Sequence, residues 1–134
     1  MKQPHYEDLT NLLAATVPHL RESIEAVREW WAPDTPGQHV IYGDIFNPYL
    51  AELLEAGTNE KALTEAFALL EDLAKSNEVH VQEVAGYTVL EELLTNEALL
   101  ARARNFMGPA TLALLSDVEE FWRRLRAARR DAPP

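Results

Sequence analysis

Apolar side chains recur every three or four residues along most of this chain, which is the spacing of one face of an α-helix. The first such stripe includes Leu9 and Leu13 and continues in phase to Trp31. Pro18 interrupts it, and proline inside a helix removes a hydrogen bond and clashes with the preceding turn. The pattern therefore predicts one N-terminal helix over residues 7–32, kinked or restarted at Pro18.

Residues that favour turns follow this helix and predict the longest loop, over residues 32–43. Pro36–Gly37 is a dipeptide typical of turns. Asp44 is expected to cap the next helix, with Asn47–Pro48 as an alternative start. Apolar stripes return beyond this point, so we expect a helical core over residues 44–127.

Polar residues and glycines divide this core into separate helices. Gly57 is expected to end one helix, because glycine tolerates the left-handed conformation that helix ends often need. Thr58 or Asn59 is expected to cap the next helix, and Asn96 a later one. Phe67 lies in the cleanest apolar stripe, so we expect its side chain in the hydrophobic core.

The helix expected from Val79 to Leu94 is apolar around most of its circumference between Val84 and Leu90. A helix that is apolar on all sides is buried, which places this one at the centre of the fold. Gly86 lowers its helix propensity by about 1 kcal/mol relative to alanine. A neighbouring helix that approaches closely would explain the glycine.

The chain length and the absence of strand patterns set the fold class. A chain of 134 residues with 47% hydrophobic composition supports one core rather than two. We therefore predict an all-α fold, with a single helical domain over residues 1–134 built as a compact bundle of about six to seven helices. No apolar run approaches the roughly 20 residues of a membrane-spanning helix, and no secretory signal is visible. We accordingly expect a cytoplasmic protein without membrane contacts.

The helices on either side of residue 77 resemble a HEAT-type antiparallel hairpin. The second helix reads Val79-His80-Val81-Gln82-Glu83-Val84-Ala85-Gly86-Tyr87-Thr88-Val89-Leu90. A valine followed by a polar residue and then by small and aliphatic residues is similar to the repeat's pattern. The arginine that is usual in the repeat is glutamine here, and only one hairpin matches well.

A second resemblance covers residues 39–122. The segments His39–Phe46 and Phe106–Leu112, with the Val-Leu-Glu-Glu-Leu-Leu run at 89–94, resemble those of a family of small uncharacterised bacterial helical proteins. The resemblance implies a link to immunity proteins of bacterial toxin systems. It carries no catalytic motif to this chain.

The charge is strongly acidic and unevenly distributed. The chain has 22 acidic and 12 basic residues, and residues 44–97 carry 12 acids against Lys61 and Lys75. An acidic body repels the phosphates of nucleic acid, whereas it attracts a basic protein partner. The alternative is that the acids serve only solubility.

Five arginines lie in residues 123–130, near the expected end of the last helix. Basic side chains there stabilise the helix dipole. An arm that binds an acidic ligand is the alternative interpretation.

The histidines offer little for catalysis or metal binding. His19 and His80 each precede a glutamate by three residues, the reverse of the order in helical di-iron proteins, so we expect surface pairs. His39 and Asp44 could act as base and orienter, but no nucleophile lies near them in sequence. We expect His39 to be a loop residue, and we predict no cofactor, no metal and no enzymatic activity.

The neighbouring tryptophans Trp30 and Trp31 cannot both face the core, because adjacent helix positions point about 100° apart. Trp31 is in phase with the apolar stripe and is expected to be buried. Trp30 is then either exposed, as at many binding hot spots, or covered by the 32–43 loop.

These features favour a protein that works by binding another protein. We expect an immunity-type protein that binds and neutralises a cognate bacterial toxin by occlusion, the toxin domain being basic. A general helical adaptor with no toxin partner is the alternative. The residues expected to contact the partner are Trp30, His39, Tyr42, Glu52, Glu55, Asp72, Glu91 and Glu92.

Overall fold

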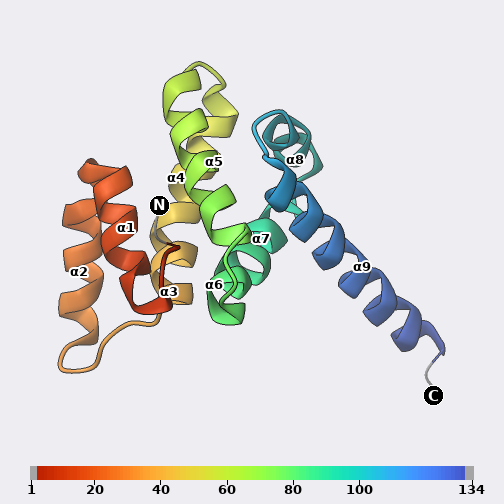
Figure 1. Ribbon diagram of the computed structural model, residues 1–134, viewed down its shortest axis with the longest axis horizontal. Coiled ribbons are helices and arrows are strands. Elements are labelled where there is room, and N and C mark those ends of the chain that lie inside the picture. The colour runs from red at the N-terminus through yellow and green to blue at the C-terminus, as the bar shows by residue number, and fades with distance from the viewer. Residues whose placement is uncertain (1–2, 132–134) are drawn as a thin grey trace.

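The computed structural model describes residues 3–131, so the outermost five residues of the expected domain lie outside the described part. No strand occurs within residues 3–131, and the predicted all-α fold is confirmed (Figure 1). The helices are α1 (Leu9–Thr16), α2 (Arg21–Trp31), α3 (Gln38–Ile41), α4 (Asn47–Ala56), α5 (Glu60–Ala74), α6 (Val79–Glu83), α7 (Glu91–Leu93), α8 (Glu97–Arg104) and α9 (Pro109–Asp131).

Two pairs of these elements are continuous helices that contain a widened turn. The π-helical segment Tyr42–Phe46 joins α3 to α4, and Val84–Leu90 joins α6 to α7. In the first, the backbone N–H of Asn47 donates to the carbonyl of Tyr42, five residues back. Pro48 follows at once and has no N–H to donate to the ordinary partner four residues back.

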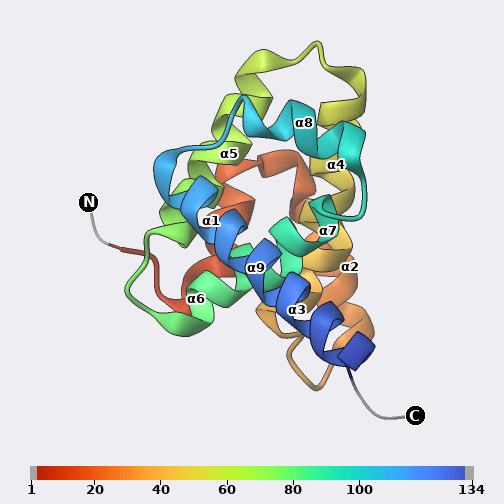
Figure 2. The ribbon, with the colours of Figure 1, turned by 90° about the vertical axis from the view of Figure 1, so that its right-hand side faces the viewer.

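The helices are arranged as an array that begins with α1 and α2 and ends with α9 (Figure 1). Helix α1 packs on α3 and α5, and α4 packs on α5 and α8. The first half of α9 packs on α5 and on the Val84–Leu90 segment. Figure 2 looks onto α9, which crosses in front of this body.

The N-terminal helix is not the single kinked helix that the apolar stripe predicts. The chain reverses at Pro18, so that α1 and α2 form an antiparallel hairpin in which Arg28 Nη2 donates to Asn11 Oδ1 at 3.4 Å. Proline restricts the residue before it to extended conformations, and Val17 has φ −129° and ψ 79°. The helical stripe therefore restarts in a new direction.

The expected loop over residues 32–43 is also wrong, since helix α3 begins at Gln38. The buried Gln38 side chain accepts a hydrogen bond of 2.6 Å from Thr10 Oγ1, which holds the start of this helix against α1. Only residues 32–37 form the connection. Asp44 is exposed in the interior of the continuous helix and does not cap it.

The expected helix ends and caps are confirmed where local chemistry decides them. Gly57 has a left-handed φ of 65° at the end of α4. The Asn59 side chain accepts a hydrogen bond from the Ala62 N–H, and Asn96 accepts one from the Leu99 N–H, both at 3.1 Å.

Phe67 and Gly86 lie at the centre of the packed core, as predicted. Phe67 is buried and stacks on Phe106 with 5.9 Å between ring centroids. A Cβ on Gly86 would lie 3.3 Å from Val118 Cγ2, so the close approach comes from α9. The segment Val84–Leu90 is largely buried between α5 and α9.

Candidate protein-binding surface

A small hollow lies between α4 and the connection from α7 to α8. Its volume is about 190 Å³, and Glu55 and Glu92 lie on opposite sides of it. The residues that line it are Asn47, Leu50, Ala51, Glu55, Val89, Glu92, Leu93, Thr95, Asn96 and Leu99. It therefore brings together two acids that are 37 residues apart in the sequence.

A larger groove lies between the α7–α8 connection and α9. Its volume is about 870 Å³. The residues that line it are Glu91, Leu94, Thr95, Glu97, Leu100, Ser116, Glu119, Glu120, Trp122, Arg123 and Arg126. Thr95 lines both depressions, so the hollow and the groove adjoin.

The acids around these depressions differ in whether their charge is already balanced. Glu119 pairs with Arg104 at 3.1 Å. Glu120 pairs with both Arg123 and Arg124, and hydrogen bonds from these two guanidinium groups hold the pKa of its carboxyl below the ordinary value. These two acids carry little unbalanced charge toward a partner.

Other acids on the same side have no ion-pair partner among residues 3–131. They are Glu52, Glu55, Glu91, Glu92 and Glu97, which we call the acidic surface. Glu52 precedes Glu55 by three residues on α4, a spacing that places both on one side of the helix. Arg102 Nη1 donates to the carbonyl oxygens of Leu54 and Glu55, which fixes α8 against the end of α4. The acidic surface thus stands on helices that are held in place by the fold.

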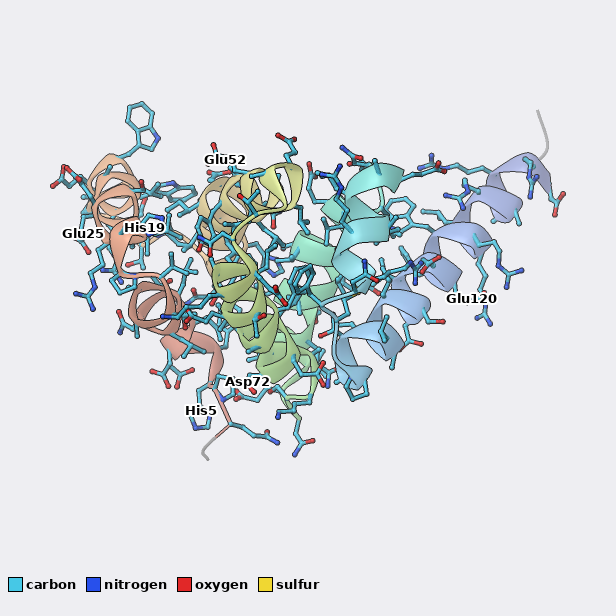
Figure 3. The ribbon with its side chains drawn as sticks, turned by 90° about the horizontal axis from the view of Figure 1, so that it is seen from above. His5, His19, Glu25, Glu52, Asp72 and Glu120 are labelled. Carbon is cyan, nitrogen blue, oxygen red and sulfur yellow. The ribbon has the colours of Figure 1, made fainter. Side chains whose placement is uncertain are left out.

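The remaining expected contact residues do not join the acidic surface. Asp72 pairs with Lys75 at 3.4 Å, and Figure 3 shows Asp72 and Glu52 on opposite sides of the molecule. Tyr42 is fully buried, and its hydroxyl donates to the carbonyl of Leu9 at 2.8 Å. Burial raises the pKa of that hydroxyl. The expectation that Tyr42 contacts a partner is therefore wrong, because its side chain belongs to the core.

His39 lies on α3 rather than in a loop, and its ring contacts the Thr88 hydroxyl through Nδ1. Within residues 3–131 no hydrogen bond joins His39 to Asp44. His80 pairs with Glu83 at 3.4 Å on one helix, as expected for a surface pair. The described residues contain no group of three or more His, Cys, Asp or Glu side chains that could hold a metal ion.

The two tryptophans lie at the far end of the array from α9 (Figure 1). The side chain of Trp30 is 86% exposed, so Trp30 is exposed and not covered by the loop that follows it. Trp31 is 40% exposed, so its expected burial is wrong. Helix α2 ends at Trp31, and the following connection does not cover the end of the helix.

Sequence patterns missed an aromatic cluster where α9 leaves the body. Tyr87 and Phe121 meet edge to face with 5.7 Å between ring centroids, and both are nearly half exposed. Trp122 lies 5.6 Å from Phe121, and its buried indole N–H has no acceptor among the described residues. The only signal in the sequence is the apolar stripe of α9, which continues through Val118 and Trp122 to Leu125.

The position of α9, which forms one wall of the groove, depends on Glu71 of α5. The carboxylate accepts hydrogen bonds from the Ala110 N–H at 3.0 Å, and from both the N–H and the hydroxyl of Thr111 at 2.8 Å. Burial opposes ionisation of Glu71, but these hydrogen bonds and the nearby Lys75 hold the pKa of the carboxyl below its ordinary value. Negative charge at a helix N-terminus is favourable, so this contact anchors α9.

No described helix combines the length and the hydropathy that a membrane span requires. A protein-family model described as a domain of unknown function, DUF7674, matches residues 10–123. The match extends from α1 to the middle of α9. Neither the curated proteins nor the solved structures contain a match to the chain.

Proposed function

We propose that this chain, which belongs to the family described as a domain of unknown function (DUF7674), is an immunity-type protein. It binds a cognate bacterial toxin through the acidic surface and neutralises the toxin by occlusion. The partner is a basic protein domain. The toxin link comes from the resemblance of the segments around residues 39–46, 89–94 and 106–112.

The observation that carries the proposal is the convergence of unpaired acids from separate helices on one hollowed side. Glu55 comes from α4, Glu91 and Glu92 from α7, and Glu97 from α8. Unpaired carboxylates project a negative potential over about 8 Å at physiological salt. A basic partner is therefore attracted from solution and oriented before the surfaces touch.

The packing of these helices favours inhibition by a preformed surface. Leu50 and Leu54 are buried on the inner side of α4, and Leu93 is buried on the inner side of α7. The helices that carry the carboxylates then need little rearrangement when a partner arrives. A preorganised surface loses less conformational entropy on binding, which favours the tight complex that neutralisation requires.

The test is affinity capture with the purified chain from a lysate of its source, followed by identification of the captured protein. The Glu52→Gln, Glu55→Gln, Glu92→Gln triple variant is compared with the wild type. A matched control carries Glu22→Gln, Glu29→Gln and Asp72→Asn, which remove the same charge from other sides of the molecule. The captured protein is then expressed alone and with each variant.

The captured protein should be basic, should arrest growth when expressed alone, and should be neutralised by the wild type and by the control. The triple variant should capture and neutralise it less well. Equal capture by the triple variant would show that the acidic surface is not the contact. A captured protein that is harmless, or that stays active in the complex, would contradict neutralisation.

A general adaptor is the second candidate, and one observation favours it. An adaptor needs two separate contact surfaces, and Trp30 is exposed at the opposite end of the array from α9. In that case Trp30→Ala would abolish capture of one partner and leave capture through the acidic surface intact.

A further inference from the structure

Beyond the Phe121–Trp122 contacts, the described end of α9 extends away from the other helices (Figures 1 and 3). Its first half is anchored by Glu71 at the N-terminus and by the contact of Val118 with Gly86. Beyond Phe121 the helix carries five arginines. Arg123 and Arg124 pair with Glu120, whereas Arg126, Arg129 and Arg130 form no ion pair among the described residues.

The groove beside α9 has the size of a short helical segment. A helix about 10 Å in diameter, with a rise of about 1.5 Å per residue, fills 870 Å³ with roughly two turns. The arginine-rich end of α9, residues 123–130, has the length of about two turns. Of these eight residues, Arg123 and Arg126 line the groove of their own chain, and the other six do not.

The groove also matches the chemistry of that end. Leu94, Leu100 and Trp122 line it with apolar side chains. Glu91 and Glu97 add two carboxylates without ion-pair partners among residues 3–131. An incoming helix with arginines and an apolar stripe through Leu125 offers both kinds of contact, because guanidinium groups form paired hydrogen bonds with carboxylates.

We propose that the occupant of this groove is the end of α9 from a second copy of the chain. The two α9 helices run antiparallel, and each copy inserts its arginine-rich end between α9 and the α7–α8 connection of the other. Arg126, Arg129 and Arg130 of one copy face Glu91 and Glu97 of the other. This inference concerns self-association and does not rest on toxin neutralisation. In the dimer, Glu52, Glu55 and Glu92 do not line the groove and stay free for a basic partner.

The geometry of the groove favours a closed pair over an open chain. Helix α9 forms one wall of the groove. The end of the same helix is the segment that enters the groove of the other copy. A two-fold axis between the antiparallel α9 helices then satisfies both grooves at once. Such a self-complementary interface closes on itself as a dimer.

The test is sedimentation equilibrium of the whole chain over a range of protein concentrations at low and high salt. The wild type should form dimers that weaken as salt rises. The Arg126→Gln, Arg129→Gln, Arg130→Gln variant and the Glu91→Gln, Glu97→Gln variant should each weaken dimerisation by about tenfold or more. A Glu22→Gln, Glu29→Gln control on α2 should dimerise as the wild type does, and circular dichroism should show every variant folded.

A charge-exchange pair makes the test specific for this interface. One variant carries Arg126→Glu, Arg129→Glu and Arg130→Glu, and the other carries Glu91→Arg and Glu97→Arg. In a homodimer of either variant, the end of α9 would enter a groove of like charge, so each variant alone should be monomeric. Mixed together, they should form a heterodimer, because both grooves then face opposite charge. A monomeric wild type, a dimer that both neutral variants preserve, or a mixture that stays monomeric would each overturn the proposal.

Discussion

A Cβ atom on Gly108 would lie 2.5 Å from Cδ of Glu71. That carboxylate receives the first free N–H groups of α9, from Ala110 and Thr111. The absence of a side chain at Gly108 is therefore what allows Glu71 to reach the helix N-terminus. One glycine and one carboxylate together set where the longest helix begins.

Gly108→Ala should destabilise the fold by about 1–3 kcal/mol, because the added methyl displaces the Glu71 carboxylate or shifts the start of α9. Urea unfolding monitored by circular dichroism measures the loss. Gly37→Ala is the matched control, since nothing lies within 4 Å of a Cβ there. Equal stability of the two variants would contradict this account of Gly108.

The Glu71 carboxyl should make the free energy of unfolding depend on pH in the acidic range. Its pKa is lower in the folded chain than in the unfolded one, so its contribution is fully present above the unfolded value. The contribution is lost as the pH falls through the folded value. Glu71→Gln should therefore be less stable than the wild type at neutral pH, and the difference should shrink in acid. A difference that stays the same down to acid pH would contradict this role of Glu71.

Phe67→Ala should lower the free energy of unfolding by about 3–5 kcal/mol, because it removes a buried ring that stacks on Phe106. Thermal and urea unfolding both measure this. Leu112→Ala, at a partly exposed position of α9, should cost much less. A small effect at Phe67 would mean that the contact of α5 with Phe106, in the connection between α8 and α9, is not part of the stabilising core.

The acidic surface should control how fast a partner binds. The Glu52→Gln, Glu55→Gln, Glu92→Gln variant should slow association and flatten its salt dependence, with a smaller effect on dissociation. Glu91 stays native, so that the groove beside α9 is unchanged. Stopped-flow kinetics at low and high salt measure both rates. If the rates follow those of the Glu22→Gln, Glu29→Gln, Asp72→Asn control, the acids serve solubility alone.

His39→Ala and Asp44→Asn should leave neutralisation of a partner intact. Both residues are exposed on the α3–α4 helix, and no hydrogen bond joins their side chains among residues 3–131. Growth rescue by each variant, with folding checked by circular dichroism, measures this. Loss of rescue by a folded variant would favour a catalytic role.

Local sequence signals predicted the features that neighbouring residues determine. Asn59 and Asn96 cap helices through N–H groups three residues ahead, and Gly57 turns the chain with its own left-handed φ. The burial of Phe67 follows from a stripe within a single helix. None of these required knowledge of distant contacts.

Features that depend on distant contacts were not predictable from periodicity. The start of α3 depends on the hydrogen bond between Gln38 and Thr10, which are 28 residues apart. The apolar stripe stays in phase across Pro18 although the chain reverses there, because a stripe records spacing and not direction. The groove combines Glu97 with Trp122 from different helices, so no single helix pattern contains it.

The two π-helical turns have a consequence for how the chain length can change during evolution. Each turn holds one residue more than an α-helical turn, and the Asn47 amide after the first donates to the Thr88 carbonyl in the second. Deleting one residue from either turn would rotate everything after it by about 100° relative to what precedes it. Relatives should therefore keep the lengths of both long helices fixed and confine insertions to the connections, above all to residues 32–37.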